Sequence, residues 1–215
     1  MSNSDPYKIL IPVPEADPSL EYTGERFHSG MEGEIAHEHY HRYLFARQFC
    51  HKEVVVDAAS GEGYGSAILG QVAEKVIGVD ISEAAVLHAN TSYHSDVVSY
   101  RHGSCTKLPI DDWSVDVFVS FETIEHIEDH DSFINEIRRV LKPGGLLVIS
   151  SPDKDVYSGP GGQPNPFHLR ELTRAQFVNL VSSAFVNSAF LDQKSTMASI
   201  IAPSVSEMSL AGSFE

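Results

Sequence analysis

The sequence is poor in cysteine and has no long apolar run. Only Cys50 and Cys105 occur among its 215 residues, so no disulfide framework is expected and a reducing compartment is indicated. No stretch approaches the roughly 20 apolar residues that a membrane helix needs. The opening MSNSDPYK also lacks the charged-then-apolar layout of a signal peptide. We therefore expect a cytoplasmic protein with no membrane partner.

Basic residues are also scarce. There are 15 lysines and arginines against 30 aspartates and glutamates, which gives a formal net charge of −15. A surface of this charge repels phosphate backbones. The densest basic group, Arg138, Arg139 and Lys142, lies near the end of a predicted helix, where cations favour the helix dipole. Nucleic acid is therefore a poor candidate for a partner.

Apolar strands alternate with amphipathic helices along most of the chain. Strands are predicted at 54–58, 75–80, 97–102, 115–121 and 146–151, with two short β-like stretches at 186–191 and 197–203. Helices are predicted at 32–50, 66–73, from Ser82 onward, at 131–141, where Pro143-Gly144-Gly145 makes the turn that follows, and at 172–185. This alternation predicts an α/β fold with a doubly wound, mostly parallel sheet and helices on both faces.

A glycine-rich turn, DAASGEGYG at 57–65, follows the first predicted strand and leads into a helix. Backbone N–H groups in such a turn can approach a ligand closely because glycine has no Cβ. Asp80 lies at the end of the second predicted strand, where a carboxylate can accept both ribose hydroxyls of a nucleoside. The alternative is that Asp80 only caps the next helix, although Ser82 is better suited to that role.

These residues resemble the class I S-adenosylmethionine-dependent methyltransferases. DAASGEG resembles their first motif, VIGVD their ribose-binding strand end, and LKPGG before LLVIS the turn preceding their fifth strand. The resemblance implies a Rossmann-like fold with seven strands and S-adenosylmethionine as cofactor. Ala59 replaces the usual glycine, and Ser104-Cys105 replaces an acidic residue that often holds the adenine amino group. The implied cofactor-binding residues are Asp57, Ala59, Gly61, Gly63, Asp80, Ile81, Ser104, Cys105 and Phe121.

Two carboxylates and a histidine follow the fourth predicted strand. Glu122 and Glu125 are three residues apart, so a helical turn would point both the same way, with His126 adjacent. His168 lies in a loop after the fifth strand, at the same edge of the sheet. Mixed oxygen and nitrogen donors of this kind match a divalent ion. In metal-free proteins, however, a Glu–His pair can instead cap a helix or line a binding site.

The same group resembles the metal-dependent O-methyltransferases, in which Glu-x-x-Glu-His follows the fourth strand. This resemblance implies a Mg²⁺ site at Glu122, Glu125, His126 and His168, with His126 or His168 as catalytic base where it is not a ligand. A cation that orients two neighbouring oxygens implies a vicinal diol or a catechol. The expected reaction is O-methylation of a sugar hydroxyl in polysaccharide, glycolipid or glycoside biosynthesis.

A second histidine-rich segment, HEHYHRY at 37–43, precedes the main domain. With YTGERF at 22–27 it resembles the N-terminal arm of methyltransferases encoded among polysaccharide and glycosyltransferase genes, and a solvated helix face is the alternative. The resemblance implies that Arg26 or Arg42 holds the methionine carboxylate of the cofactor. The expected organisation is an arm and lid helix at 1–50, the methyltransferase domain at 51–205 and a tail at 206–215.

Three other functions stay open. A quinone or phenol methyltransferase would keep the same cofactor site. An RNA 2′-O-methyltransferase shares the metal pattern but requires a basic face that this sequence lacks. A non-catalytic cofactor-binding module would bind S-adenosylmethionine without turnover. The expected partner is a small-molecule or oligosaccharide substrate, and a homodimer is one open oligomeric state.

Overall fold

Five parallel strands form the centre of the fold in the computed structural model, which describes residues 33–159 and 165–195. The order across the sheet is β3-β2-β1-β4-β5. The strands are β1 (Val54–Ala58), β2 (Lys75–Asp80), β3 (Val98–His102), β4 (Val115–Ser120) and β5 (Leu141–Ile149). The winding reverses between β1 and β4, and open parallel sheets bind ligands beyond the carboxyl ends of the strands at such a point.

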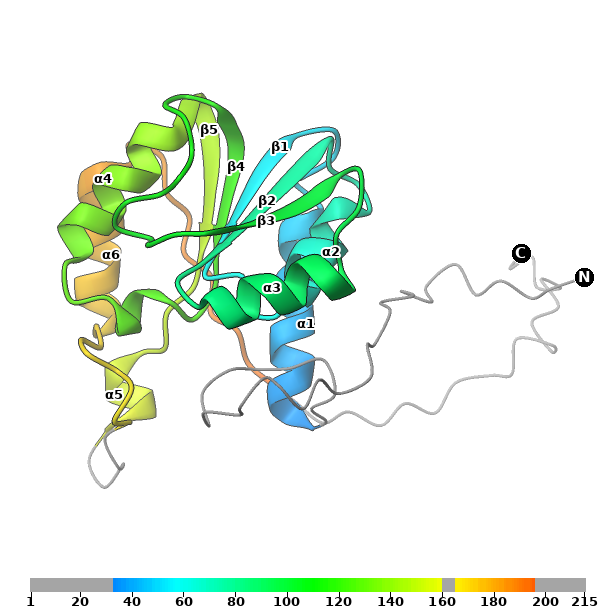
Figure 1. Ribbon diagram of the computed structural model, residues 1–215. Helices are drawn as coiled ribbons and strands as arrows, with labels where there is room; N and C mark the ends of the chain where they lie inside the picture. Colours follow the sequence, from blue (N-terminus) through cyan, green and yellow to red (C-terminus); the bar gives the residue numbers. More distant parts are fainter. Residues whose placement is uncertain (1–32, 160–164, 196–215) are drawn as a thin grey trace, which may run out of the picture.

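Helices cover both faces of this sheet (Figure 1). One face carries α1 (Glu34–Arg47), α2 (Tyr64–Gly70) and α3 (Glu83–Ser92), and the other carries α4 (His130–Val140) and α6 (Arg174–Ala184). The short 3-10 helix η1 (Ile124–His126) follows β4, and the single-turn helix α5 (Lys154–Tyr157) follows β5. In this part of the chain no helix has both the length and the hydropathy of a transmembrane span.

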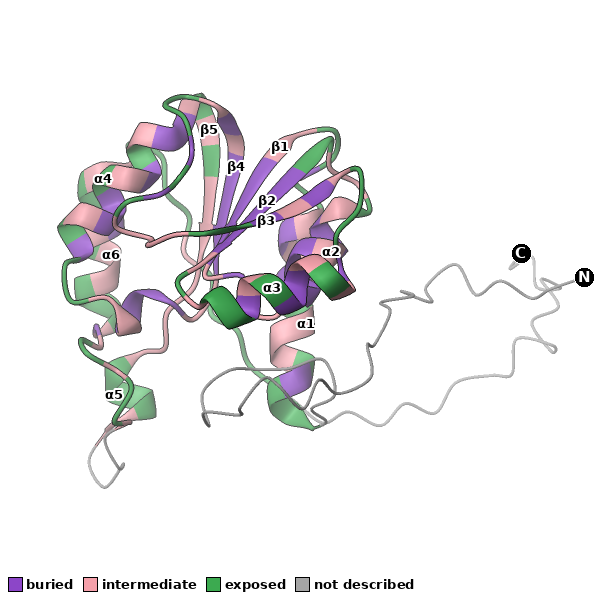
Figure 2. Cartoon of the chain, in the orientation of Figure 1, coloured by how far each residue is buried: buried purple, intermediate pink, exposed green. Residues whose placement is uncertain are grey.

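Two hydrophobic cores fill the spaces between sheet and helices. The side-chain period of two sends Val55 and Val117 into the core beneath α1 and α2, and Val56 and Phe118 into the core beneath α4. Figure 2 shows the buried residues concentrated along the strands and on the helix sides that face them. Because both faces are covered, the strands are apolar on both sides, which explains their continuous apolar runs.

Helix α1 is part of the first core. Tyr43 and Ala46 are buried, and the Tyr43 ring lies 5.4 Å from the Tyr64 ring of α2 in an edge-on arrangement. The helix predicted at 32–50 is therefore present but packs as a structural element of the domain, and a lid is not confirmed. The predicted arm, with Arg26 and residues 1–32, lies outside the described residues.

The sheet has five strands in the described residues, where seven were predicted. The strand predicted at 186–191 is wrong, since those residues form no strand. Phe190 packs its ring 6.3 Å from that of Phe177 in α6, whereas Val186 and Leu191 are exposed. Side-chain contact with the helix thus replaces strand pairing there. The second stretch, 197–203, lies outside the described residues.

The junction of α4 and β5 also differs from expectation. The helix ends at Val140 and β5 begins at once, so Pro143-Gly144-Gly145 lies within the strand and forms no separate turn before it. The register moves from Val115↔Leu141 to Val117↔Leu146, which leaves residues 142–145 as a bulge. Lys142 Nζ donates to both carboxylate oxygens of Asp116 at 2.8 Å and attaches this bulge to β4.

Candidate active site

The glycine-rich turn joins β1 to α2 in a conformation that favours glycine. Gly61 and Gly63 have φ values of 55° and 96°, and Ala59 also has a positive φ of 58°. A Cβ on Gly63 would lie 2.8 Å from the Ala89 side chain of α3 and from the Tyr100 ring of β3. The turn therefore packs tightly against its neighbours, and its backbone lies at the carboxyl end of β1.

Asp80 ties this turn to the end of β2. Its Oδ2 accepts the Gly61 N–H at 2.9 Å, and its Oδ1 accepts the Ser82 N–H at 2.8 Å. The capping role belongs to Ser82, whose side chain accepts the Ala85 N–H at 3.3 Å and begins α3. Each carboxylate oxygen of Asp80 retains acceptor capacity, so the residue can hold the turn and still accept hydroxyl hydrogen bonds.

Ile81 and Cys105 lie beside Asp80. Ile81 is 73% exposed, so it offers an apolar surface next to the carboxylate. Burial raises the pKa of the Cys105 thiol to about 12, with the Asp80 carboxylate adding to the shift and a hydrogen bond to the Ala59 backbone opposing it. Cys105 therefore stays a neutral thiol against the turn. The Ser104 hydroxyl is paired with Thr106 Oγ1 at 2.9 Å.

Asp57, the acidic residue of the first motif, is fully buried and faces the helices. Its Oδ1 accepts the Tyr43 hydroxyl at 3.1 Å, and its Oδ2 accepts the Ser66 hydroxyl at 2.7 Å. Burial raises the pKa of Asp57 to about 7, although these two hydrogen bonds oppose the shift. The carboxylate thus connects α1, β1 and α2. Its contact with a cofactor stays a prediction.

Arg42 brings a cation from α1 to the end of β4. Its Nε donates to Gln193 Oε1 at 2.8 Å, and its Nη1 lies 3.8 Å from Glu122 Oε1. The Nη1 atom is buried and has no hydrogen-bond partner among the described residues. Beside it, the Phe121 ring lies 5.0 Å from the Tyr43 ring in an edge-on arrangement. The structure therefore brings Arg42 and Phe121, two predicted cofactor residues, to this strand end.

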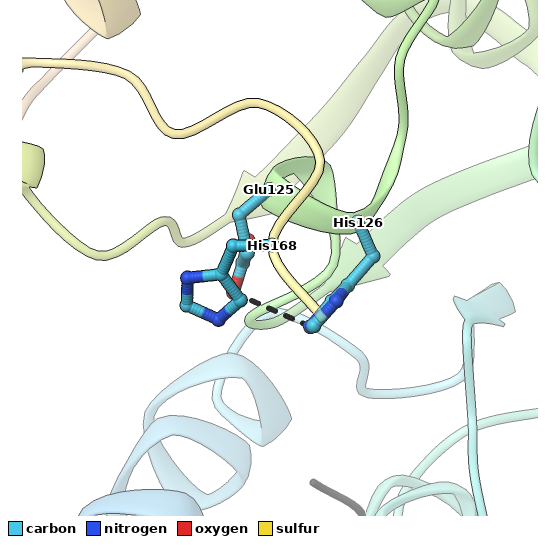
Figure 3. A group of neighbouring side chains, drawn as sticks. All are labelled: Glu125, His126 and His168. Atoms are coloured by element: carbon cyan, nitrogen blue, oxygen red, sulfur yellow. Dashed lines mark ion pairs between the residues drawn. The ribbon is translucent and has the colours of Figure 1, made fainter. Parts of the chain in front are cut away.

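Glu125, His126 and His168 converge at the same edge (Figure 3). One ligand atom from each lies within 4.8 Å of the others, and His126 Nε2 is 3.9 Å from Glu125 Oε1. Helix η1 supplies the first two, and the loop before α6 supplies His168. That loop is attached to η1 because the Glu125 carbonyl accepts the N–H groups of Leu169 and Arg170 at 2.9 and 3.0 Å.

Glu122 is not part of this group. Helix η1 begins only at Ile124, and Glu122 has a φ of 48°, so the two glutamates do not share the helical turn that their spacing predicted. The Ser150 hydroxyl of the following strand end donates to Glu122 Oε1 at 2.5 Å. The partners of the Glu122 carboxylate are therefore Ser150 and Arg42, and not the residues of this group. Metal ligation by Glu122 stays a prediction.

Glu171 is a site residue that the sequence reasoning missed. His168 Nδ1 lies 2.6 Å from Glu171 Oε1, which also accepts the Ser158 hydroxyl at 2.8 Å. Burial favours a higher pKa for Glu171, but the hydrogen bonds from Ser158 and His168 outweigh it and hold the pKa below its usual value. The sequence feature that could have indicated this pair is that Glu171 follows His168 by three positions in HLRE.

The donors present fit a divalent cation. A buried carboxylate and two imidazoles provide one oxygen and two nitrogen ligands. Mg²⁺ prefers oxygen ligands, whereas imidazole also suits Mn²⁺, Fe²⁺ and Zn²⁺. The side chain of Glu125 is only 2% exposed, and a buried carboxylate is stabilised by a nearby positive charge. The site is thus chemically compatible with a divalent ion and does not by itself select Mg²⁺.

Methyltransferases are among the known proteins to which this chain is similar. Residues 56–149 match the family model described as "Methyltransferase domain". A Mycolicibacterium smegmatis protein named "Probable S-adenosylmethionine-dependent methyltransferase" is 40% identical over 169 residues, covering 77% of this chain and 65% of that protein. A protein of the same description from Mycobacterium tuberculosis H37Rv is 37% identical, covering 79% and 63%. The chain thus spans just under two thirds of these relatives.

Solved structures show the same fold. The Haloferax volcanii methyltransferase in complex with the Trm112 activator aligns with a TM-score of 0.60 and 25% identity, covering 70% of each chain. This likeness supports the α/β fold, in which the glycine-rich turn, Asp80 and η1 lie at the ends of β1, β2 and β4.

Proposed function

We propose that this chain, which carries a methyltransferase domain and is homologous to S-adenosylmethionine-dependent methyltransferases, transfers the cofactor's methyl group to a hydroxyl oxygen of a sugar. The observation that supports the chemistry is the convergence of Glu125, His126 and His168 beyond β4. This group lies at the same sheet edge as the glycine-rich turn and Asp80, so one edge offers both a nucleoside site and proton-accepting side chains.

The cofactor is proposed to lie along the ends of β1, β2 and β4. Asp80 would accept the ribose hydroxyls, and the exposed Ile81 would pack on the adenine ring. The buried Nη1 of Arg42 is proposed to donate to the methionine carboxylate, because a buried guanidinium N–H gains most from a charged acceptor. Positioning the cofactor in this way orients the methyl group toward η1.

Glu125, with one or both of His126 and His168, would hold the divalent cation, which the resemblance implies is Mg²⁺. When bound, such an ion lowers the pKa of a hydroxyl and orients neighbouring oxygens. A histidine that is not a ligand would accept the proton of the attacking hydroxyl through its Nε2. Glu122 is proposed to contribute from beside this group, where Ser150 donates to its carboxylate and the Arg42 guanidinium lies nearby.

A sugar with a vicinal diol is the proposed acceptor, since a cation at this group would orient two neighbouring oxygens. The net charge of −15 supports an uncharged small molecule or oligosaccharide over nucleic acid, and a cytoplasmic location is part of the proposal. A quinone or phenol acceptor is the second candidate because a catechol also offers two adjacent oxygens.

Metal dependence is the decisive test. Excess chelator should abolish methyl transfer from labelled S-adenosylmethionine while calorimetry still detects cofactor binding, because the turn and Asp80 do not use the ion. Glu125→Ala should behave like chelation, and Glu125→Gln should recover part of the activity at high Mg²⁺ or Mn²⁺. The exposed Glu128→Gln is the matched control.

The outcomes separate the parts of the proposal. Full activity in excess chelator would reject the cation and would assign the base role to His126. Transfer to phenols in a panel that also contains diol-bearing sugars, with no transfer to the sugars, would reject the carbohydrate acceptor. Binding of S-adenosylmethionine with no transfer to any member of the panel would favour the non-catalytic module.

A further inference from the structure

Both histidines of the cluster have Nδ1 beside a hydrogen-bond acceptor. His126 Nδ1 lies 3.0 Å from the Phe167 carbonyl oxygen, and His168 Nδ1 lies 2.6 Å from Glu171 Oε1. A carbonyl and a carboxylate accept hydrogen bonds but do not donate them, so each Nδ1 must carry the proton. In a neutral imidazole the other nitrogen, Nε2, then presents a lone pair, which is the form that binds a cation or accepts a proton.

A second contact supports this tautomer at His168. Asn165 Nδ2, an amide donor, lies 3.2 Å from His168 Nε2, so Nε2 acts as the acceptor in this arrangement. The Asn165 carbonyl also accepts the His168 N–H at 3.1 Å, which folds the loop back on itself. The amide of Asn165 therefore occupies the lone pair that a cation would need.

The surroundings of His168 restrict its ring. Its side chain is only 6% exposed, and that of Glu171 is 9% exposed. The Tyr157 ring of α5 lies 5.1 Å from it on one side, and the His126 ring lies 5.0 Å away in an edge-on arrangement. The Ser158 hydroxyl holds the Glu171 carboxylate at 2.8 Å. A ring held in this way keeps the direction of Nε2.

We propose that Glu171 is a positioning residue that fixes His168 in the Nδ1–H tautomer, and that Asn165 is a displaceable partner of Nε2. A divalent cation then binds His168 only when the Asn165 amide leaves. The cation part of this inference rests on the proposed function, whereas the tautomer part concerns the metal-free protein. Carboxylate partners of this kind orient histidine ligands and raise their basicity, and losing one typically costs roughly 10–100-fold in metal affinity.

The tautomer of the neutral His168 ring can be read in the metal-free protein by two-bond ¹H–¹⁵N correlation. The wild type should show protonated Nδ1 and unprotonated Nε2. Glu171→Ala should shift the ring toward a mixture of tautomers, Glu171→Gln should keep the pattern because its amide oxygen still accepts, and Glu128→Gln should have no effect. An Nε2–H tautomer in the wild type, or an unchanged pattern in Glu171→Ala, would overturn the positioning role.

Calorimetric titration with Mn²⁺ and Mg²⁺ tests the second part. Glu171→Ala should bind the ion roughly 10–100-fold more weakly. Asn165→Ala should bind it about 2–10-fold more tightly, since one competing hydrogen bond is removed. Weaker binding in Asn165→Ala would make Asn165 a ligand and overturn its displaceable role. No binding in the wild type would reject the cation and the role of Asn165, while the tautomer measurement still decides the role of Glu171.

Discussion

Asp80 has two tasks within one side chain. Its carboxylate oxygens accept the N–H groups of Gly61 and Ser82, so the residue shapes the turn that it is proposed to complete as a cofactor site. A substituted side chain would therefore change both the ribose contact and the position of the turn. Substitution of Asp80 is therefore expected to affect more than a single ligand contact.

Asp80→Ala should weaken S-adenosylmethionine binding by about 1.5–3 kcal/mol, the range for hydrogen bonds to a charged group. Isothermal titration calorimetry measures the dissociation constant directly. Asp96→Ala, which removes an exposed carboxylate after α3, is the control and should bind normally. An unchanged constant in Asp80→Ala would remove the residue from the cofactor site.

Helix α1 contributes to the cofactor edge through one side chain. Tyr43 donates to Asp57, and its ring fills the space above Gly65, where a Cβ would lie 2.0 Å from Tyr43 Cζ. The same ring contacts Phe121 at the end of β4. One aromatic residue therefore links the helix to two strand ends and to the glycine-rich turn, which makes α1 a support for the site.

Bound cofactor should slow amide exchange in α1 as well as around Gly61 and Gly63, because ordering the turn also orders its packing partner. Tyr43→Phe should reduce the effect in α1 by removing only the hydroxyl that Asp57 accepts. Tyr40→Phe, whose ring packs 5.5 Å from that of Tyr64, is the control. Identical exchange in α1 with and without cofactor would leave the helix uncoupled from the site.

The stability of the whole molecule should depend on pH through Asp57. The pKa of this buried carboxyl is raised from 3.8 to about 7, so between these values the folded protein binds more protons than the unfolded chain. Stability from this group is therefore fully present below the lower value and is lost as pH rises through the upper one, at up to about 1.4 kcal/mol per pH unit.

Urea unfolding at the two ends of that window measures this dependence. Asp57→Asn keeps an acceptor oxygen but cannot ionise. The free energy of unfolding of this variant should therefore increase relative to that of the wild type as the pH rises. Titrating groups that do not interact with Asp57 contribute equally to both proteins and cancel in the difference. Parallel pH profiles for the two proteins would show that Asp57 does not titrate in this range.

Much of the fold was predictable because its signals are local. Strands 54–58 and 75–80 were predicted at the bounds that the structure has, since continuous apolar runs are enough to mark buried parallel strands. Ser82 and Thr173 begin α3 and α6 as predicted, because a cap is a hydrogen bond to a residue only three positions away. The glycine-rich turn was recognisable for the same reason.

Contacts between distant segments required the folded chain. Glu122 does not join the group of Glu125, His126 and His168, and Ser150, from another strand end, donates to its carboxylate. Glu171 is the partner of His168 because the folded loop and the Ser158 hydroxyl position its carboxylate. Spacing along a chain specifies which side chains can share a helical face. Which carboxylate meets which imidazole depends on strand pairing and loop attachment, whose partners lie far apart in the sequence.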